Sequence, residues 1–586
     1  MVKTLAAQVG EYKKASFLTP MFMILEVIME MIIPLMMASI IDDGVDKGNI
    51  NHIVLIGIFM IIAALFGLFC GIMGGVFGAK ASAGFAKNLR RSMFERIQTF
   101  SFSNIDHFSS ASLVTRMTTD VTNIQNAYQM ILRMCFRAPL SLICAMAMSF
   151  YVNVRLASIY LVAVIILGTI LGIIVANAMK YFPRMFRKYD ELNASVQENV
   201  SAIRVVKAYV REDYEKTKFE KAADGLYRIA CTAERIVAVN APVMMLAIYS
   251  CMLLISWMGA RMIVQNLLTT GELMMLLTYC MNILMNLMML SLVFVMLTIS
   301  QASAERICEV LTEEPDIVNP ENPLYEVENG EIIFDHVSFR YNEKSENPVL
   351  NDINLTIRSG ETIGIIGGTG SSKSSLVNLI SRLYDVSEGS LKVGGHDVKE
   401  YDIETLRNKV SVVLQKNVLF SGTILENLRW GNKDAGREEC IRACRLACAD
   451  EFIDKLPDGY DTYIEQGGSN VSGGQKQRLC IARALLKEPR ILILDDSTSA
   501  VDTSTDARIR KAFREEIPNV TKLIISQRIS SVQDADRILV MENGRINGFD
   551  THEELLKINE IYRDVYESQV RGNDPEKEIQ AQGEEV

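Results

Sequence analysis

The sequence lacks an excess of positive charge, because its 60 lysine and arginine residues are outnumbered by 70 aspartate and glutamate residues. The formal net charge of −10 at pH 7 argues against a nucleic-acid-binding protein, since contacts with phosphate backbones need clustered Lys and Arg. We also expect no cleavable signal peptide. The first apolar segment, near 19–40, is too long for one, and no small-residue cleavage site follows it. That segment is typical of a first membrane-spanning helix.

The eleven cysteines form no Cys-x-x-Cys pair and no regular framework. Cys440, Cys444 and Cys448 recur every four residues and would share one face of a helix, but no histidine lies near them in the sequence. A metal or redox site is therefore a weaker interpretation than three small buried hydrophobic residues. The cytosol would keep such thiols reduced.

Hydrophobic residues make up 49% of the chain, and its first half contains six long apolar stretches. A helix needs about 20 residues to cross the hydrocarbon core of a bilayer, and each stretch reaches that length. We therefore expect six transmembrane helices in a lipid bilayer. The predicted spans are 17–40, 52–79, 132–152, 156–178, 236–264 and 273–299.

The connections between these stretches alternate in length and charge. The short connection 41–51 carries three aspartates and one lysine, whereas the long connections after the second and fourth spans are rich in Lys and Arg. Because Lys and Arg collect on the cytoplasmic side, we expect a multi-pass protein of the cytoplasmic membrane with both termini and both long loops in the cytoplasm. The loops are helical in composition, and we expect them to turn near 112–121 and 206–215.

The composition changes near Ser303, and the proline-containing acidic segment 313–323 indicates a linker. Beyond it, β-rich apolar runs alternate with helical stretches, which predicts an α/β domain with a mainly parallel sheet. The chain is thus expected to comprise an N-terminal elbow segment 1–16, a transmembrane domain 17–305, a linker 306–330, an α/β domain 331–568 and a disordered acidic tail 569–586.

A glycine-rich turn follows the predicted strand 362–366 and leads into a helical stretch at 375–383, which is the context that a phosphate-binding loop requires. Backbone N–H groups of such a turn point at phosphate oxygens, with the helix dipole behind them. Lys373 would reach the β- and γ-phosphates of ATP, and the Ser374 hydroxyl would hold Mg²⁺. The last glycine of the usual motif is replaced by Ser372. The expected nucleotide contacts are Gly367, Gly368, Thr369, Gly370, Ser371, Ser372, Lys373, Ser374 and Ser375.

Two further segments carry phosphate-site chemistry. Asp495 ends the hydrophobic strand 490–494, where a carboxylate can support Mg²⁺, although a turn aspartate would look the same. Between the glycine-rich turn and Asp495, a run of small residues opens a long helix. Such residues can present a hydroxyl, N–H groups and a helix N-terminus to a phosphate. The serine among them also suits a simple helix cap. These residues are Ser472, Gly473, Gly474 and Gln475.

The order and spacing of these segments resemble the ATPase domain of ABC transporters, and the six spans with two long loops resemble the exporter-type membrane domain. The resemblance implies an α-helical membrane domain of six transmembrane helices joined to an α/β P-loop ATPase domain. It also implies that Tyr341 stacks on adenine, that Gln415 contacts Mg²⁺ in the loop joining the ATP site to the membrane domain, and that 499–502 form the D-loop. In this family each ATP lies between the phosphate loop of one ATPase domain and the signature segment, here 472–475, of another.

Three residues depart from the family pattern, and all belong to this chain's own ATP pocket. Asp496 stands where the family usually has a catalytic Glu, Gln527 stands where it has a switch His, and Ser372 replaces a glycine. A shorter carboxylate reaches the attacking water poorly, and Gln cannot become cationic. The signature segment keeps its Ser-Gly-Gly-Gln core. The resemblance is therefore closest to the degenerate-site subunit of heterodimeric bacterial multidrug exporters.

In that interpretation the chain binds ATP, hydrolyses it weakly alone, and lends its signature segment to a second half-transporter with the consensus Glu and His. Two alternatives remain: a homodimeric exporter of lipid or peptide, and a regulatory ATP-sensing membrane subunit without transport. The spans and the acidic charge exclude a soluble ABC protein of DNA repair.

The cargo is expected to be an amphipathic drug or another hydrophobic small molecule, by analogy alone. Glu26 and Glu30 share a helix face and would attract a cationic cargo, or would simply sit in water at the mouth of the bundle. The many methionines of the last two spans suit either an adaptable cargo surface or contact with lipid. Arg133 and Arg137 flank the third predicted span and are expected to snorkel.

Overall fold

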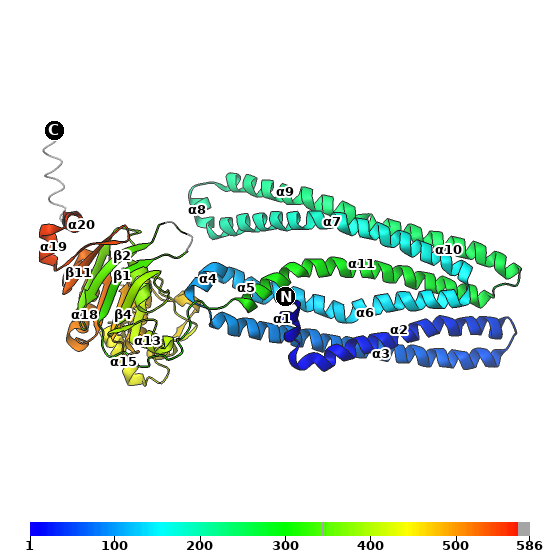
Figure 1. Cartoon of the computed structure of the whole chain (residues 1–586), viewed down its shortest axis with the longest axis horizontal. Helices are drawn as coiled ribbons and strands as arrows, with labels where there is room; N and C mark the ends of the chain where they lie inside the picture. Colours follow the sequence, from blue (N-terminus) through cyan, green and yellow to red (C-terminus); the bar gives the residue numbers. More distant parts are fainter. Residues whose placement is uncertain (343–344, 346, 498–499, 572–586) are drawn as a thin grey trace. The chain divides into compact units, whose positions relative to one another are not determined.

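The computed structural model describes residues 1–342, 345, 347–497 and 500–571. The chain divides into two compact units, whose helices and strands are labelled in Figure 1. The first unit consists of Met1–Thr99 and Ser109–Glu313, and the second consists of Phe100–Phe108 with the chain from Glu314 onward. A short piece of the first half therefore packs with the second half. The tail expected at 569–586 begins inside helix α20 (Glu560–Arg571), and from residue 572 it lies outside the described residues.

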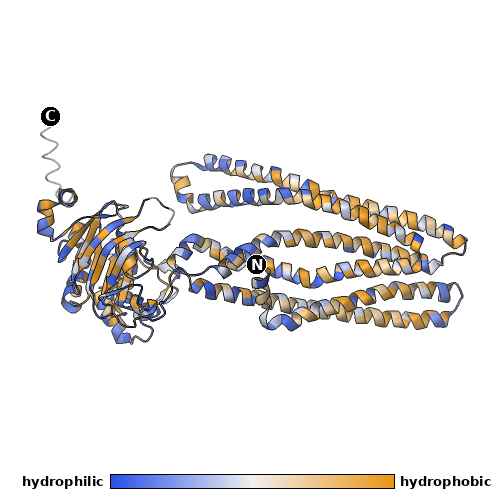
Figure 2. Ribbon diagram, in the orientation of Figure 1, coloured by the Kyte–Doolittle hydropathy of each residue, from blue (hydrophilic) through white to orange (hydrophobic). Residues whose placement is uncertain are grey.

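Within the described part of the first unit, six helical segments are long and apolar enough to cross a membrane, which confirms the predicted spans. Figure 2 shows apolar residues along most of these helices and hydrophilic residues where α7 approaches α8. Two helices greatly exceed the bilayer, since α3 has 49 residues and α7 has 48. The helices are α1 (Val2–Ala7), α2 (Lys13–Ser39), α3 (Ile50–Gln98), α6 (Val121–Val152), α7 (Val154–Ser201), α9 (Glu212–Ala238), α10 (Asn240–Val264) and α11 (Thr270–Thr312).

Polar side chains define the helix ends on the side of the short connections. Asn153 alone separates α6 from α7, and its Oδ1 accepts the N–H groups of Arg155 and Leu156 at 3.1 and 3.2 Å. Asp42 follows α2 and accepts the Gly271 N–H at 2.8 Å and the Thr269 hydroxyl at 2.6 Å. These bonds satisfy backbone donors that a helix start leaves open, and they fasten the end of α2 to the start of α11.

The long connection after α3 turns earlier than predicted. The chain turns around α4 (Phe102–Phe108), and α5 (Ser110–Thr115) then runs through the π-helical stretch Arg116–Asp120 into α6. The prediction of a turn near 112–121 was wrong, because the Ser- and Thr-rich segment is helical. Thr118 donates its hydroxyl to the Val114 carbonyl at 2.8 Å, so its polar group is satisfied inside the helix. The second predicted turn, 206–215, falls between α8 (Ile203–Ala208) and α9.

A network of charged and polar side chains around the buried Asp120 joins the start of α6 to the last turns of α11. Asp120 is only 1% exposed, and its Oδ2 lies 2.7 Å from Arg306 Nε. Ser303 donates to the other carboxylate oxygen at 2.9 Å. One turn earlier, Arg116 Nη1 pairs with Glu309 Oε2 at 2.6 Å. Each pair joins a buried side chain to one that is nearly half exposed, since Arg306 is 48% and Glu309 46% exposed. Water therefore screens part of each attraction, but the contacts still link the two helices.

The second unit contains a six-stranded sheet in the order β12-β11-β3-β10-β9-β6. The strands from β11 to β6 pair in parallel, and β12 is an antiparallel edge strand, which confirms the mainly parallel sheet. A four-stranded antiparallel sheet, β2-β1-β4-β5, was not predicted. The strands are β1 (Ile332–Phe339), β2 (Leu350–Ile357), β3 (Thr362–Gly367), β4 (Glu388–Val393), β5 (His396–Asp397), β6 (Val410–Val413), β7 (Gly422–Thr423), β8 (Tyr463–Ile464), β9 (Ile491–Asp495), β10 (Thr521–Ile525), β11 (Arg537–Glu542) and β12 (Arg545–Asp550).

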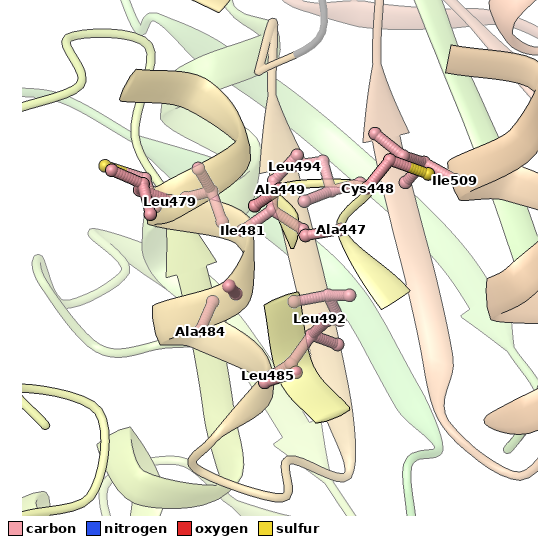
Figure 3. Close-up of a cluster of buried hydrophobic side chains, with 14 of the residues drawn as sticks. Ala447, Cys448, Ala449, Leu479, Ile481, Ala484, Leu485, Leu492, Leu494 and Ile509 are labelled. Atoms are coloured by element: carbon pink, nitrogen blue, oxygen red, sulfur yellow. The ribbon is translucent and has the colours of Figure 1, made fainter. Parts of the chain in front are cut away.

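Two hydrophobic clusters form the core of this unit, and one of them lies between α17 and β9 (Figure 3). Leu479 and Ile481 of α17 and Leu492 of β9 are fully buried there. Cys440, Cys444 and Cys448 are buried in the same cluster, in agreement with their interpretation as small hydrophobic residues. The helices are α12 (Lys373–Ile380), α13 (Ile403–Lys409), α14 (Ile424–Leu428), α15 (Arg437–Leu446), α16 (Asp450–Ile453), α17 (Gly473–Leu485), α18 (Thr503–Glu516), α19 (His552–Ile558) and α20 (Glu560–Arg571).

Candidate nucleotide-binding site

The phosphate loop, residues 367–375, connects the end of β3 to α12 at the carboxyl edge of the six-stranded sheet. Gly367 cannot carry a side chain, because a Cβ there would collide with the Met541 carbonyl oxygen of the neighbouring strand. Gly370 has φ +83°, a conformation that glycine adopts readily. Gly368, Thr369 and Gly370 are exposed, so this part of the loop presents its backbone to solvent.

Ser372 adopts a left-handed conformation directly before α12, with φ 71° and ψ 24°. A residue with a Cβ pays roughly 1–2 kcal/mol for this conformation, whereas glycine does not. The replacement of glycine by Ser372 therefore strains the loop at the residue that precedes Lys373. Strain of this kind persists when the surrounding structure enforces the backbone path, and here β3 and α12 both do so.

Lys373 folds back over the loop. Its Nζ donates to the carbonyl oxygens of Gly367 and Gly368, both at 2.8 Å, and to Ser371 Oγ at 3.1 Å. Burial lowers the pKa of Lys373, while the carboxylates of Asp495 and Asp496 act to raise it. The ammonium group therefore lies inside the loop, close to two acids, where phosphate oxygens could replace the carbonyl acceptors.

Asp495 ends β9 and is only 6% exposed. Burial raises the pKa of its carboxyl group, and hydrogen bonding from Ser374 and the charge of Lys373 oppose that shift. The structure thus brings Ser374 and Asp495 together, as predicted from the sequence. A hydroxyl and a carboxylate oxygen are the hard donors that Mg²⁺ takes alongside phosphate oxygens and water, so these two residues fit that ion.

Strand pairing places Asp496 and Gln527 after the ends of neighbouring strands. β9 and β10 are parallel neighbours with Asp495 opposite Ile525, and the Asp496 N–H donates to the Ile525 carbonyl at 3.1 Å. Asp496 has φ 48°, a second strained residue at this edge. Gln527 follows β10 by two residues and is exposed. An acid and an amide therefore lie at the strand ends beside the phosphate loop.

Tyr341, the expected adenine-stacking residue, is half-exposed and reaches the phosphate loop. Its hydroxyl lies 2.9 Å from Ser375 Oγ. Its ring also meets Tyr384 edge-on, with the centroids 5.0 Å apart. Tyr384 in turn donates to Asp106 Oδ2 at 2.6 Å and touches the ring of Phe102, both in α4. Sequence reasoning missed Tyr384, because no motif marks it and its role appears only through these contacts.

The signature segment, residues 472–475, forms the start of α17. Ser472 and Gln475 make a capping box, in which the Gln475 side chain accepts the Ser472 N–H at 2.9 Å and Ser472 Oγ accepts the Gln475 N–H at 3.4 Å. The helix-cap interpretation therefore describes Ser472 in the single chain. Gly474 approaches the Ala500 carbonyl so closely that an added Cβ would lie 2.8 Å from that oxygen. The expected D-loop follows at Ala500, while Ser499 lies outside the described residues.

The two segments of the expected ATP site belong to different elements, since 367–375 lead into α12 and 472–475 open α17. Among the described residues, no hydrogen bond or ion pair joins 472–475 to 367–375. Gln415 follows β6, which pairs with β9, and its side chain is exposed. The phosphate loop, Asp495, Asp496 and Gln527 thus follow the carboxyl ends of neighbouring strands, and the signature segment opens α17.

The predicted cargo residues are ion-paired inside the membrane unit. Arg137 of α6 lies 3.5 Å from Glu26 Oε1 and 3.3 Å from Glu30 Oε2. The expectation that Arg137 snorkels at a helix flank was wrong, because α6 begins at Val121 and Arg137 points into the bundle toward α2. Two carboxylates share one guanidinium, and Glu26 Oε2 is buried without a hydrogen-bond partner among the described residues.

Comparison with known proteins matches both units. Residues 16–288 match the family model of the ABC transporter transmembrane region, and residues 350–499 match the ABC transporter family model. The ABC transporter ATP-binding protein YfiB of Bacillus subtilis (strain 168) is 38% identical over 95% of this chain and 98% of its own length. Rv1273c of Mycobacterium tuberculosis (strain ATCC 25618 / H37Rv), described in the same terms, is 36% identical over 97% and 98%. A bacterial Atm1-family ABC exporter solved with ATP bound shares the fold, with a TM-score of 0.79, 23% identity, and 96% and 98% of the two chains covered.

Proposed function

The chain belongs to the ABC transporter family, as a multi-pass membrane protein with an ATP-binding domain, and we propose that it is the degenerate-site subunit of a heterodimeric exporter. In this proposal its own pocket binds ATP and turns it over slowly. Its signature segment completes the pocket of a partner half-transporter that has the consensus Glu and His. Most of the hydrolysis that drives export then occurs in the partner's pocket.

One observation carries the proposal: the departures from the family pattern are confined to one surface of the ATPase domain. Ser372, Asp496 and Gln527 belong to the sheet edge that surrounds Lys373, whereas the signature segment retains its capping box and its close-packed Gly474. Selection for a homodimer would act on both surfaces together, since each dimer site needs both. Substitution of one surface alone supports unlike subunits.

Each pocket residue would contact a different part of Mg·ATP. Lys373 exchanges its carbonyl acceptors for phosphate oxygens, and the loop N–H groups cradle the same phosphates. Ser374 and Asp495 would hold Mg²⁺, with Gln415 approaching from the end of β6, and Tyr341 would stack on the base. The bound ion would neutralise developing phosphate charge. Asp496 is one methylene shorter than Glu, which leaves the attacking water without a well-placed base and slows turnover by about 10²–10⁴.

The transported compound is proposed to be an amphipathic or hydrophobic small molecule, expelled across the cytoplasmic membrane with both termini and the ATPase domain in the cytoplasm. Glu26 and Glu30 supply two negative charges against one positive charge from Arg137. This imbalance favours a cargo that carries a positive charge. Uptake assays that compare a cationic dye with a neutral dye of equal size would test it, and equal export of both by wild type and by Glu30→Gln would contradict it.

Purification of the tagged full-length chain from its native host tests the central proposal. We expect a second, unlike ABC half-transporter to co-purify in equal amount, with Glu and His at the positions of Asp496 and Gln527. The complex should hydrolyse ATP on the order of 10²-fold faster than this chain alone. A preparation that contains two copies of this chain and is fully active would contradict the heterodimer and favour a homodimeric exporter. An ATP-binding complex that moves no cargo would favour an ATP-sensing subunit.

A further inference from the structure

The last described helix, α20, reaches back to the segment that carries Gln527. The side-chain Nε2 of Gln569 donates to the Gln527 carbonyl oxygen at 2.7 Å, and its Oε1 accepts the Ile529 N–H at 2.9 Å. One side chain therefore holds backbone groups on both sides of Arg528. Only a side-chain amide offers a donor and an acceptor at this spacing, so the contact depends on the residue type.

Helix α20 is well anchored at its start. Tyr562 is fully buried, and its hydroxyl lies 2.7 Å from His552 Nδ1. Asn559 accepts the Tyr562 N–H at 2.9 Å and donates to Asn547 Oδ1 at 2.7 Å. Because the first turn of α20 is fixed to the body of the unit, the position of Gln569 two turns later is also defined.

The switch segment, residues 526–529, also has contacts of its own: the Ser526 N–H donates to the Ile365 carbonyl of β3 at 3.3 Å, and Ile529 is buried in the core cluster. The Arg528 N–H donates to Ser526 Oγ at 3.0 Å, and the Ser531 N–H donates to the Arg528 carbonyl at 3.1 Å. Gln527 itself is exposed. The two bonds from Gln569 come from 40 and 42 residues away, so they tie the switch segment to the C-terminal helix.

We propose that Gln569 is a positioning residue for the switch segment and that α20 thereby sets how long ATP stays in this pocket. By fixing the Gln527 carbonyl and the Ile529 N–H, Gln569 holds the Gln527 backbone beside Asp496 at the sheet edge. Loss of either bond lets the switch segment move and releases the nucleotide sooner. The inference rests on the proposed function of this pocket as a slow ATP site.

The test uses the full-length complex in lipid nanodiscs, with the partner's phosphate-loop lysine replaced so that ATP binds only in this chain's pocket. Hydrogen exchange of the backbone amides at 525–531 and the dissociation rate of a fluorescent Mg·ATP analogue are measured. Gln569→Ala should accelerate exchange of the Ile529 amide by about tenfold, as expected for loss of one hydrogen bond. ATP dissociation should become several-fold faster.

Two further variants separate the bonds from general stability. Gln569→Glu keeps the acceptor for the Ile529 N–H and loses the donor to Gln527, so the Ile529 amide should stay protected while ATP still leaves faster. Ser568→Ala, at an exposed neighbour in α20, should change neither measurement. Unchanged exchange at 525–531 in Gln569→Ala would overturn the positioning role, and so would faster exchange with an unchanged ATP dissociation rate. Failure of the unmodified pocket to bind the analogue would refute the proposed function instead, before any variant is compared.

Discussion

Two surfaces of the same ATPase domain differ in how relaxed their backbone is. The pocket surface, around Lys373, contains two non-glycine residues with left-handed backbone, Ser372 and Asp496. The signature surface opens α17 with a satisfied capping box and rests on the buried cluster of Figure 3. Both surfaces are built on the same sheet, so the fold does not explain the contrast. In the proposed heterodimer the two surfaces perform different chemistry, since the signature surface supplies only shape and N–H groups, whereas a hydrolytic pocket needs a well-placed base.

The largest expected effect comes from restoring the pocket surface. The double substitution Asp496→Glu and Gln527→His should raise ATP turnover in this pocket by about 10²–10⁴, because a longer carboxylate reaches the attacking water. ATPase rates of the proposed heterodimer, measured with the partner's own catalytic Glu replaced, would show the gain. The single substitution Gln527→His serves as the control and should recover little. An unchanged rate in the double variant would mean that the pocket is limited by something other than these side chains.

The second-largest effect on the ATPase rate is expected from substitutions on the signature surface. Ser472→Asp preserves an N-cap but sets a carboxylate against the phosphate of the partner's ATP, and should lower the ATPase rate of the complex by about 10². Ser472→Asn keeps the cap without the charge and should lose less. The matched change on the pocket surface, Asp496→Asn, should leave the rate within about twofold. Equal losses from Ser472→Asp and Asp496→Asn would erase the contrast between the surfaces.

A smaller effect is expected from pH. Burial lowers the pKa of Lys373 below the ordinary value for lysine, so the protonated form that attracts phosphate is lost at a lower pH than usual. ATP affinity of the pocket should therefore fall as pH rises through that pKa, by up to about tenfold per pH unit. Asp496→Asn removes a charge that raises the pKa of Lys373, so the loss of ATP affinity should occur at lower pH. Isothermal titration at several pH values measures both, and a shift to higher pH would contradict the electrostatics.

The smallest expected effect concerns backbone strain. Ser372→Gly should relieve the left-handed conformation, and part of the gain is lost to the greater entropy of glycine in the unfolded chain. A net stabilisation of no more than about 1 kcal/mol is expected, with tighter ATP binding. Ser371→Gly is the opposite control, because Ser371 accepts a hydrogen bond from Lys373, and it should destabilise. Thermal unfolding of the full chain would rank the variants, and equal shifts would argue against strain at Ser372.

Sequence reasoning succeeded where a local pattern determines position. The six spans and the parallel sheet follow from apolar runs of characteristic length, and the contact between Ser374 and Asp495 follows because parallel strands end at one edge. It failed where position depends on packing. β4 contains Glu, Gly, Ser and Lys among its six residues and shows little apolar alternation, and the second sheet was missed with it.

The other features that the sequence did not predict also depend on packing between distant parts of the chain. The pairing of Arg137 with Glu26 and Glu30 joins different helices, so the spacing within either helix does not reveal it. Tyr384 and Gln569 act through residues far away in the chain, and their neighbours in sequence carry no motif. The turn before α5 was misplaced because Ser and Thr favour turns yet can bond back to a helix carbonyl, as Thr118 does.

The ion pairs between α6 and α11 have a mechanical consequence. Asp120 pairs with Arg306, and one turn away Arg116 pairs with Glu309, so the two helices are joined at two levels close to where α11 ends. Sliding one helix past the other would separate both pairs and leave the buried Asp120 without its cation. Movement of the last turns of α11 should therefore carry the start of α6 with it.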